Sequence, residues 1–201
     1  MKIYILRHED RTQDATFFSP LTKLGLDNAE KLIEPLEKLN IKHIYSSPFV
    51  RTLQTIYPFS KKNNIKVKLE YGLSELQNED IIPKKSYQVR LPEYMAELFN
   101  YEPNYKEKVE PENLIYPEKE INVLSRVRSI LKHIVTIHGE TDDNILIVTH
   151  QTVCRTILKI VKKYGVLKPS EEILNNYPKG GLTEVLDGTV WVCKEINWKT
   201  K

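Results

Sequence analysis

The sequence contains too few cysteines for several common classes of protein. It has two in 201 residues, Cys154 and Cys193, with no Cys-x-x-C pair and no metal-binding spacing. A disulfide-rich secreted scaffold and a cysteine-based zinc module are therefore excluded. We expect both residues to be buried thiols in a reducing compartment.

Long apolar runs and blocks of one charge are also missing. No apolar stretch is long enough to span a bilayer, and no basic region followed by an apolar region opens the chain. The formal net charge is only +3, with 30 Lys and Arg interleaved among 27 Asp and Glu. This pattern argues against a nucleic-acid-binding arm or a membrane-binding patch. We expect a cytoplasmic protein that binds neither nucleic acid nor membrane.

The overall composition is that of a folded domain. Hydrophobic residues make up 40% of the chain and charged residues 28%, and we find no internal repeat. A chain of 201 residues can bury a substantial core. We therefore expect residues 1–201 to form a single domain, with residues 76–117 inserted as a cap.

The cap expectation rests on the irregularity of residues 76–117. The segment has five prolines and six tyrosines or phenylalanines but no long periodic stretch, apart from a short helix expected near residues 93–99. A segment of this length inside a compact domain is usually a functional lid. We interpret its aromatic residues mainly as packing within the cap. Four of its side chains fit sugar phosphates, nucleotides and phosphopeptides equally well: Tyr87, Arg90, Tyr105 and Lys106.

Hydrophobic periodicity predicts strands that alternate with helices. Short apolar runs of β-forming residues indicate four strands, at 3–6, 41–45, 67–69 and 144–149. Apolar residues at helical spacing predict four helices, at 22–39, 49–62, 121–137 and 152–163. Pro35 and Pro58 should distort the first two helices, and an Asp-Gly turn at 187–188 predicts a C-terminal hairpin. This order predicts a three-layer α/β/α sandwich with a mostly parallel central sheet.

Reactive side chains follow the ends of all four predicted strands. They are Arg7 and His8, Arg51, Glu75, and His150. Ligands of α/β folds bind outside the carboxyl ends of the strands, so we expect these side chains to share one pocket. A guanidinium binds phosphate through two parallel hydrogen bonds, which favours a phosphoryl ligand. One imidazole can then act as a nucleophile, the other can stabilise the phosphoryl oxygens, and the carboxylic acid can protonate the leaving oxygen.

Each of these residues also has a simpler structural interpretation when taken alone. His8 could be a hydrogen-bonded histidine at the end of a strand, and Arg51 could be a solvated residue at a helix start, although a cation there opposes the helix dipole. Glu70 and Glu79 compete with Glu75 for the role of general acid. The other histidines have no comparable placement and are interpreted as structural: His43, His133 and His138.

Several short motifs occur along the chain in a recognisable order. They are Leu6-Arg7-His8, Pro20-Leu21-Thr22 with Gly25, Ser46-Ser47-Pro48 with Arg51 and Gln54-Thr55, residues 69–75, and Val148-Thr149-His150. In this order and spacing the chain resembles the histidine phosphatase, or phosphoglycerate mutase-like, superfamily over nearly its whole length. It most resembles the branch with the suppressor-of-T-cell-receptor-signalling type phosphatases, in which an arginine follows three places after the histidine. That arginine is Arg11 here.

The resemblance implies a phosphatase that hydrolyses a phosphomonoester through a phosphohistidine on His8. It implies that Glu75 acts as the general acid and then as the base that activates water. Four further side chains would hold the phosphoryl oxygens: Arg7, Arg11, Arg51 and His150. No metal or organic cofactor is implied. The expected partner is a small phosphorylated substrate or a phosphopeptide, and the oligomeric state is left open.

Two positions depart from the family pattern and keep two alternatives open. Glu9 stands where the family usually has glycine, and Gln151 replaces a small residue. A Glu9 carboxylate that faced the pocket would repel phosphate, whereas one that pointed toward Arg11 or a lysine would do little harm. One alternative function is a mutase that returns the phosphoryl group to its product, although dedicated mutases of this family are usually longer. The other is a catalytically weak domain that binds phosphorylated ligands.

Overall fold

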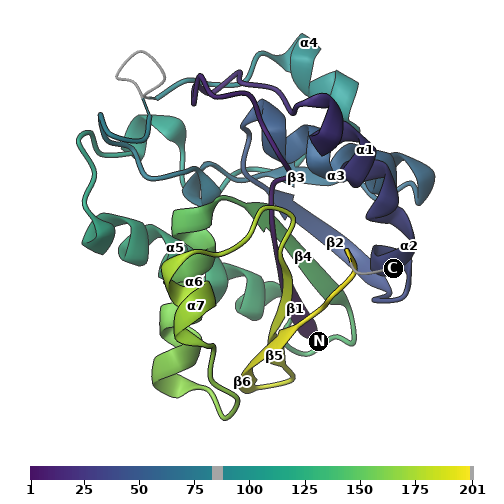
Figure 1. The fold of residues 1–201 in the computed structure, drawn as a ribbon, viewed down its shortest axis with the longest axis vertical. Coiled ribbons are helices and arrows are strands. Elements are labelled where there is room, and N and C mark those ends of the chain that lie inside the picture. The colour runs from purple at the N-terminus through teal and green to yellow at the C-terminus, as the bar shows by residue number, and fades with distance from the viewer. Residues whose placement is uncertain (83–87, 200–201) are drawn as a thin grey trace.

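The computed structural model describes residues 1–82 and 88–199, and within them six strands form one sheet (Figure 1). The strands are β1 (Lys2–Arg7), β2 (Ile41–Ser46), β3 (Val67–Leu69), β4 (Asn144–Thr149), β5 (Leu182–Asp187) and β6 (Val190–Glu195). Their order across the sheet is β3-β2-β4-β1-β5-β6. The first four strands are parallel, and β5 runs antiparallel to both β1 and β6. The predicted mostly parallel sheet with a C-terminal hairpin is confirmed.

Helices cover both faces of this sheet (Figure 1). One face carries α1 (Lys23–Lys31), α2 (Ile33–Glu37) and α3 (Val50–Lys62). The other carries α5 (Glu120–His138), α6 (Gln151–Tyr164) and α7 (Glu171–Asn175). Between β3 and α5 the described residues form four short helices: η1 (Tyr71–Leu73), α4 (Glu93–Ala96), η3 (Glu97–Phe99) and η4 (Pro111–Asn113). None of the described helices is both long and apolar enough to cross a membrane.

Side-chain alternation along the central strands builds two cores, one on each face of the sheet. In β1, Ile3 and Ile5 pack with α5 and α6, while Tyr4 and Leu6 pack with the helices of the opposite face. All four are at least 96% buried, as expected for a strand covered on both faces. The same burial stabilises β1 and β4 at the centre of the sheet. Their carboxyl ends are paired in register, with Arg7 opposite Thr149.

Proline explains one difference from the helices predicted by sequence. The predicted helix at 22–39 is two helices, α1 and α2, which meet at Leu32. In one continuous helix Pro35 would lack its amide donor and its ring would clash with the carbonyl of Lys31. In α2 it lies in the first turn, where no amide donor is needed. By contrast, α3 continues through Pro58 to Lys62.

Two local sequence features explain the C-terminal hairpin and one helix that was not predicted. Gly188 has a φ of +61° in the turn between β5 and β6, a backbone conformation that glycine adopts without steric cost. The missed helix is α7, which is too short to show apolar periodicity. Its sequence signal is Ser170, whose side chain accepts a hydrogen bond from the amide of Ile173.

The described parts of residues 76–117 pack onto the domain through both cores. Ile82, Leu91 and Ala96 belong to the core beneath α3, and Tyr105 packs against the core beneath α5. Tyr105 therefore has the packing role that we expect for aromatic residues of this segment. Tyr87 lies outside the described residues. The division into a single domain with an inserted cap stays a prediction.

Candidate active site

The carboxyl ends of the parallel strands bring the predicted site residues to one edge of the sheet. The His8 amide donates to the Thr149 carbonyl at 3.0 Å, and the Ser47 amide donates to the Val148 carbonyl at 3.0 Å. These bonds hold the loops after β1, β2 and β4 side by side. As a result the His8 and His150 rings lie 5.3 Å apart between centroids.

The surroundings of His8 fix both its tautomer and its charge. Its Nδ1 lies 2.7 Å from the Glu9 carbonyl oxygen. A carbonyl can only accept, so Nδ1 carries the proton and Nε2 keeps its lone pair. Burial and the nearby Arg51 and Arg7 hold the pKa of His8 well below 6.5. At neutral pH the ring is a neutral imidazole with a free Nε2.

His150 is held by contacts that the sequence did not single out. It is fully buried, and its Nε2 lies 2.8 Å from the Ser47 hydroxyl. The Phe49 ring packs against it at 4.8 Å between centroids. Burial and the charge of Arg51 hold the pKa of His150 well below 6.5. Ser47 belongs to the quoted Ser-Ser-Pro motif, and the structure gives it this specific task.

The guanidiniums of Arg7, Arg11 and Arg51 lie close to one another, and the charge of Arg11 acts on the other two. Arg51 is 2% exposed, and it donates to the Thr16 carbonyl at 2.7 Å. Burial and the charge of Arg11 lower the pKa of Arg51 to about 9. Arg7 donates to the carbonyl of Tyr177, and burial lowers its pKa as well. This edge of the sheet is therefore strongly positive.

Several buried donors in this cluster have no hydrogen-bond partner. Among the described residues, the Nε atoms of Arg7 and Arg51 and the Nδ1 of His150 lack one. Buried charges and donors are costly unless they are paired. Unpaired buried groups of this kind beside cations are expected at a site that binds an anion such as a phosphoryl group.

Among the three candidate acids, Glu75 is the one placed beside the cations. It is 7% exposed, its carboxylate accepts from the Leu76 amide at 2.8 Å, and its charge opposes the lowered pKa values of Arg7 and Arg51. Glu70 is fully buried and has another task. It accepts hydrogen bonds from four groups: the Tyr105 hydroxyl and the amides of Gly72, Lys108 and Val109. Glu79 is exposed.

The Glu9 carboxylate points away from the phosphoryl site. It lies 2.9 Å from the Lys199 ammonium and accepts from the Asn28 amide at 3.2 Å. Gly180, with a φ of +66°, makes room for it, because a Cβ there would lie 1.7 Å from a Glu9 oxygen. The glycine usually found after the histidine is thus replaced by a buried carboxylate with its own lysine. Gln151, the other departure, donates to the Asn176 side chain at 2.9 Å.

Glu9→Gln should leave phosphate binding unchanged, because the carboxylate makes its contacts on the far side of the loop. The measurement is the competitive inhibition constant of inorganic phosphate. Arg51→Lys is the matched comparison, since it removes a planar donor pair from the site and should weaken inhibition. Tighter phosphate binding by Glu9→Gln would show that the carboxylate reaches the pocket.

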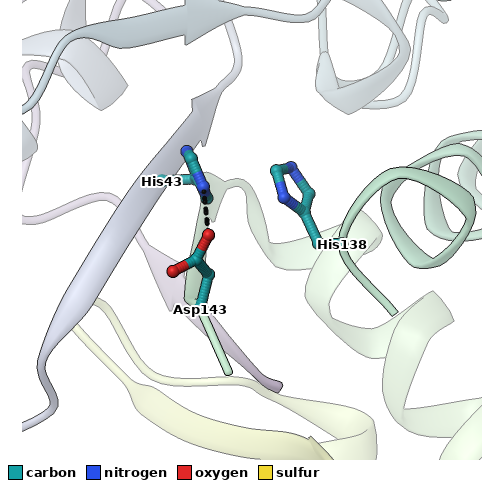
Figure 2. Close-up of side chains that lie close together, drawn as sticks. All are labelled: His43, His138 and Asp143. Atoms are coloured by element: carbon teal, nitrogen blue, oxygen red, sulfur yellow. Dashed lines mark hydrogen bonds and ion pairs between the residues drawn. The ribbon is translucent and has the colours of Figure 1, made fainter. Parts of the chain in front are cut away.

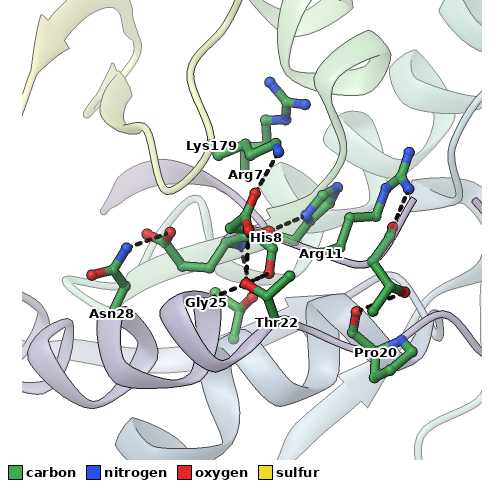
Figure 3. A network of polar contacts seen from close by, with 12 residues as sticks. Arg7, His8, Arg11, Pro20, Thr22, Gly25, Asn28 and Lys179 are labelled. Atoms are coloured by element: carbon green, nitrogen blue, oxygen red, sulfur yellow. Dashed lines mark hydrogen bonds and ion pairs between the residues drawn. The ribbon is translucent and has the colours of Figure 1, made fainter.

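The residues around Thr22 connect the start of α1 to the loop that follows His8 (Figure 3). Thr22 caps α1 by accepting from the Gly25 amide at 3.1 Å, and its hydroxyl donates to the Asp10 carboxylate at 2.7 Å. Lys179 pairs with the same carboxylate at 2.5 Å. Gly25 is required because a Cβ would lie 2.1 Å from the Asp10 carbonyl. This motif therefore shapes the loop that carries His8 and Arg11.

A buried ion pair behind the site was missed from the sequence. Arg126 donates to both oxygens of Glu118, at 2.7 and 3.0 Å, and to the carbonyls of Gly72 and Glu75 at 2.6 and 3.3 Å. The side chains of the pair are 6% and 2% exposed. Arg126 thus fixes the backbone that carries Glu75. The sequence signal for this pair is the position of Arg126, a charged residue next to Val127 on the apolar face of the helix.

A buried cluster of cations at the carboxyl edge of a parallel sheet is the arrangement expected of an α/β protein that holds a small anion. The sequence matches the family model described as the histidine phosphatase superfamily (branch 1) over residues 3–193. The chain belongs to this superfamily, as the resemblance of its motifs indicates. The narrower resemblance to one branch of phosphatases stays a prediction. A search of curated proteins found no match.

Solved structures with the same fold cover almost the entire chain. The ecdysone phosphate phosphatase of Bombix mori, in complex with tungstate, has a TM-score of 0.69 at 17% identity, covering 98% of this chain and 92% of its own. The α-ribazole phosphatase of Shigella flexneri has a TM-score of 0.66 at 19% identity, covering 98% and 96%. A mycobacterial glucosyl-3-phosphoglycerate phosphatase with inorganic phosphate has a TM-score of 0.64 at 17% identity, covering 96% and 95%. At these identities the likeness establishes the fold.

Proposed function

We propose that the protein is a phosphatase that hydrolyses phosphomonoesters through a phosphohistidine on His8. The observation that carries the proposal is a neutral imidazole, with Nε2 free, among the guanidiniums of Arg7, Arg11 and Arg51. A nucleophile needs the lone pair, and the three cations stabilise the charge that develops on the phosphoryl oxygens.

In the first step the Nε2 of His8 attacks phosphorus and the bond to the ester oxygen breaks. Glu75 in its acid form donates a proton to the leaving oxygen, so that an alcohol departs. Its hydrogen bond from the Leu76 amide orients the carboxyl group. His150, oriented by Ser47, donates to an equatorial phosphoryl oxygen in this account.

In the second step the Glu75 carboxylate takes a proton from water, and the water oxygen attacks the phosphohistidine. The P–N bond breaks, inorganic phosphate leaves and the His8 imidazole is restored. These steps use side chains alone. The phosphatase names of the structural neighbours support this reaction class, and their named substrates are small phosphomonoesters.

A small phosphorylated metabolite is the substrate class that we favour. Four of the site residues are at most 7% exposed, namely His8, Arg51, Glu75 and His150, and Glu70 ties residues 105–109 to the domain. A buried phosphoryl site of this kind suits a compact ester better than a peptide chain. The free cysteines, Cys154 and Cys193, support a cytoplasmic location.

The reaction class is tested by hydrolysis of para-nitrophenyl phosphate, with release of both nitrophenol and inorganic phosphate measured. We expect turnover that inorganic phosphate inhibits competitively. Phosphate binding without turnover by the folded protein would identify a phospho-ligand-binding domain instead. Transfer of the phosphoryl group within a phosphorylated acid, without release of phosphate, would identify a mutase.

Glu75→Gln should slow alkyl phosphates much more than para-nitrophenyl phosphate, since only an alkoxide needs a proton as it leaves. We expect kcat/KM to fall on the order of 10² to 10⁴ for glycerol phosphate and little for the aryl ester. The ratio kcat/KM is chosen because it reports the phosphorylation step and not the later attack of water. Glu79→Gln is the matched control and should change neither. If Glu75→Gln slowed both esters equally, Glu75 would not be the general acid.

The low pKa of His8 predicts that its ring stays neutral in mild acid. An imidazole with the ordinary pKa of about 6.5 would be about nine-tenths protonated at pH 5.5. Burial and the arginine charges oppose that protonation, so the ¹⁵N signals of His8, assigned with His8→Ala, should stay those of a neutral ring. In the unfolded chain the ring does take up a proton, so this histidine makes stability fall as pH drops below 6.5. A His8 titration near 6.5 would contradict the electrostatic account.

A further inference from the structure

A second group of histidines lies at the opposite edge of the sheet from the candidate active site. His43 extends from β2, His138 ends α5, and Asp143 directly precedes β4 (Figure 2). His150 comes seven positions after Asp143 along the extended chain, which corresponds to about 23 Å. This cluster therefore has no part in the phosphoryl chemistry.

The three side chains offer ligand atoms at a spacing close to that of a metal site. One nitrogen from each histidine and one oxygen from Asp143 all lie within 4.8 Å of one another. The histidine rings are 4.2 Å apart between centroids, and the His43 Nε2 is 3.0 Å from the Asp143 carboxylate. Ligand atoms on a tetrahedral zinc ion lie about 3.4 Å apart, given bonds of about 2.1 Å. The observed spacing is thus wider than that of a loaded site, and the Asp143 side chain, which is 39% exposed, has room to move toward an ion.

We propose that His43, His138 and Asp143 form a zinc-binding site that joins the end of α5 to β2 and the start of β4. Two imidazoles and one carboxylate are a ligand set suited to Zn²⁺, with water completing the coordination. The His43 side chain is 28% exposed, so an ion can enter from solvent. His138 is 5% exposed and anchors the inner side.

Neighbouring side chains orient His138 for metal binding and compete with the metal for His43. The Tyr45 hydroxyl lies 2.9 Å from the His138 Nε2, so it can accept that proton and leave Nδ1 free for the ion. Lys68 donates to the His43 Nδ1 at 3.2 Å, which places the ring proton on Nε2, toward Asp143. Zinc at Nε2 requires the other tautomer of His43, with its proton on Nδ1. Lys68 must then turn away, so the lysine acts as a competitor of the metal.

The test is a calorimetric titration of untagged protein with zinc chloride in a phosphate-free buffer. We expect one binding site in the wild type that is lost in His43→Gln and in Asp143→Asn. The same site should persist in His133→Gln, a control that replaces another histidine of α5, the helix that carries His138. It should also persist in His8→Gln, which disrupts the catalytic histidine pair. Its occupation should raise the melting temperature of the wild type and not that of His43→Gln.

Two further variants address the outer contacts. Tyr45→Phe should weaken zinc binding by about 10- to 100-fold, because it removes the partner of His138. Lys68→Met should strengthen binding, since no ammonium then competes for His43. The proposal is overturned if the wild type binds no zinc, or if His43→Gln and the wild type give the same isotherm. Weaker binding by Lys68→Met would overturn the competition that we infer.

Discussion

Replacing His8 with alanine should abolish turnover while the domain stays folded. The expected loss in kcat is on the order of 10⁴-fold or more, because no other side chain beside the cations can take over nucleophilic attack. His150 cannot substitute, since its Nε2 is engaged with the Ser47 hydroxyl and, in the proposed mechanism, its ring donates to a phosphoryl oxygen. The measurement is steady-state hydrolysis of para-nitrophenyl phosphate, with circular dichroism to verify the fold.

The control for this loss is His133→Ala, which replaces a histidine of α5. His133 is partly exposed and should be dispensable for turnover. His8→Ala should also keep its affinity for inorganic phosphate to a large extent, because the guanidiniums remain. Hydrolysis by His8→Ala at a rate near that of the wild type would remove His8 as the nucleophile.

Breaking the buried pair of Arg126 and Glu118 should have the largest effect on stability. In Arg126→Met the Glu118 carboxylate stays 98% buried with its main partner gone. The expected loss in the free energy of unfolding is about 3–5 kcal/mol. Urea unfolding at pH 7 measures it. Because Arg126 also donates to the Glu75 carbonyl, activity should fall in the remaining folded protein.

An exposed ion pair between α5 and α6 supplies the comparison. Lys159 and Glu120 lie 2.8 Å apart with side chains 49% and 62% exposed, so Lys159→Met should cost less than about 1 kcal/mol. Replacing both Arg126 and Glu118 by apolar residues should recover much of the stability, since no unpaired charge is left. A loss in Arg126→Met no larger than that in Lys159→Met would show that the pair is not a buried determinant of the fold.

The fold could be predicted from the sequence because its strands are covered on both faces. Such strands appear as apolar runs, so β4 was predicted with its observed bounds. The short strand β3 was also predicted with its observed bounds, although Lys68 interrupts its apolar residues. Parallel strands also fix where their carboxyl ends lie, which is why His8 and His150 could be placed together in advance. The position at which a helix breaks depends on backbone sterics. The division of the predicted helix into α1 and α2 at Leu32 was therefore not foreseen.

Side-chain direction is what the sequence left open at the site. Glu9 could face the phosphate or avoid it, and only the space beside Gly180 and the reach of Lys199 decide that it turns away. Glu70 and Glu75 are five residues apart and chemically alike. Tertiary contacts separate them, because Glu70 binds residues 105–109 whereas Glu75 lies beside the arginines. Long-range partners of this kind carry no local signal.

The proposed mechanism rests on a covalent bond between phosphorus and the His8 Nε2. The most direct measurement is to mix the protein with para-nitrophenyl phosphate, quench it in alkali within milliseconds, and locate the phosphoryl group by peptide mass spectrometry. We predict one phosphohistidine, on the peptide that contains His8, which forms and decays at rates consistent with turnover and is absent from His8→Ala. Turnover with no phosphorylated His8, or with the phosphoryl group on another residue, would contradict this account.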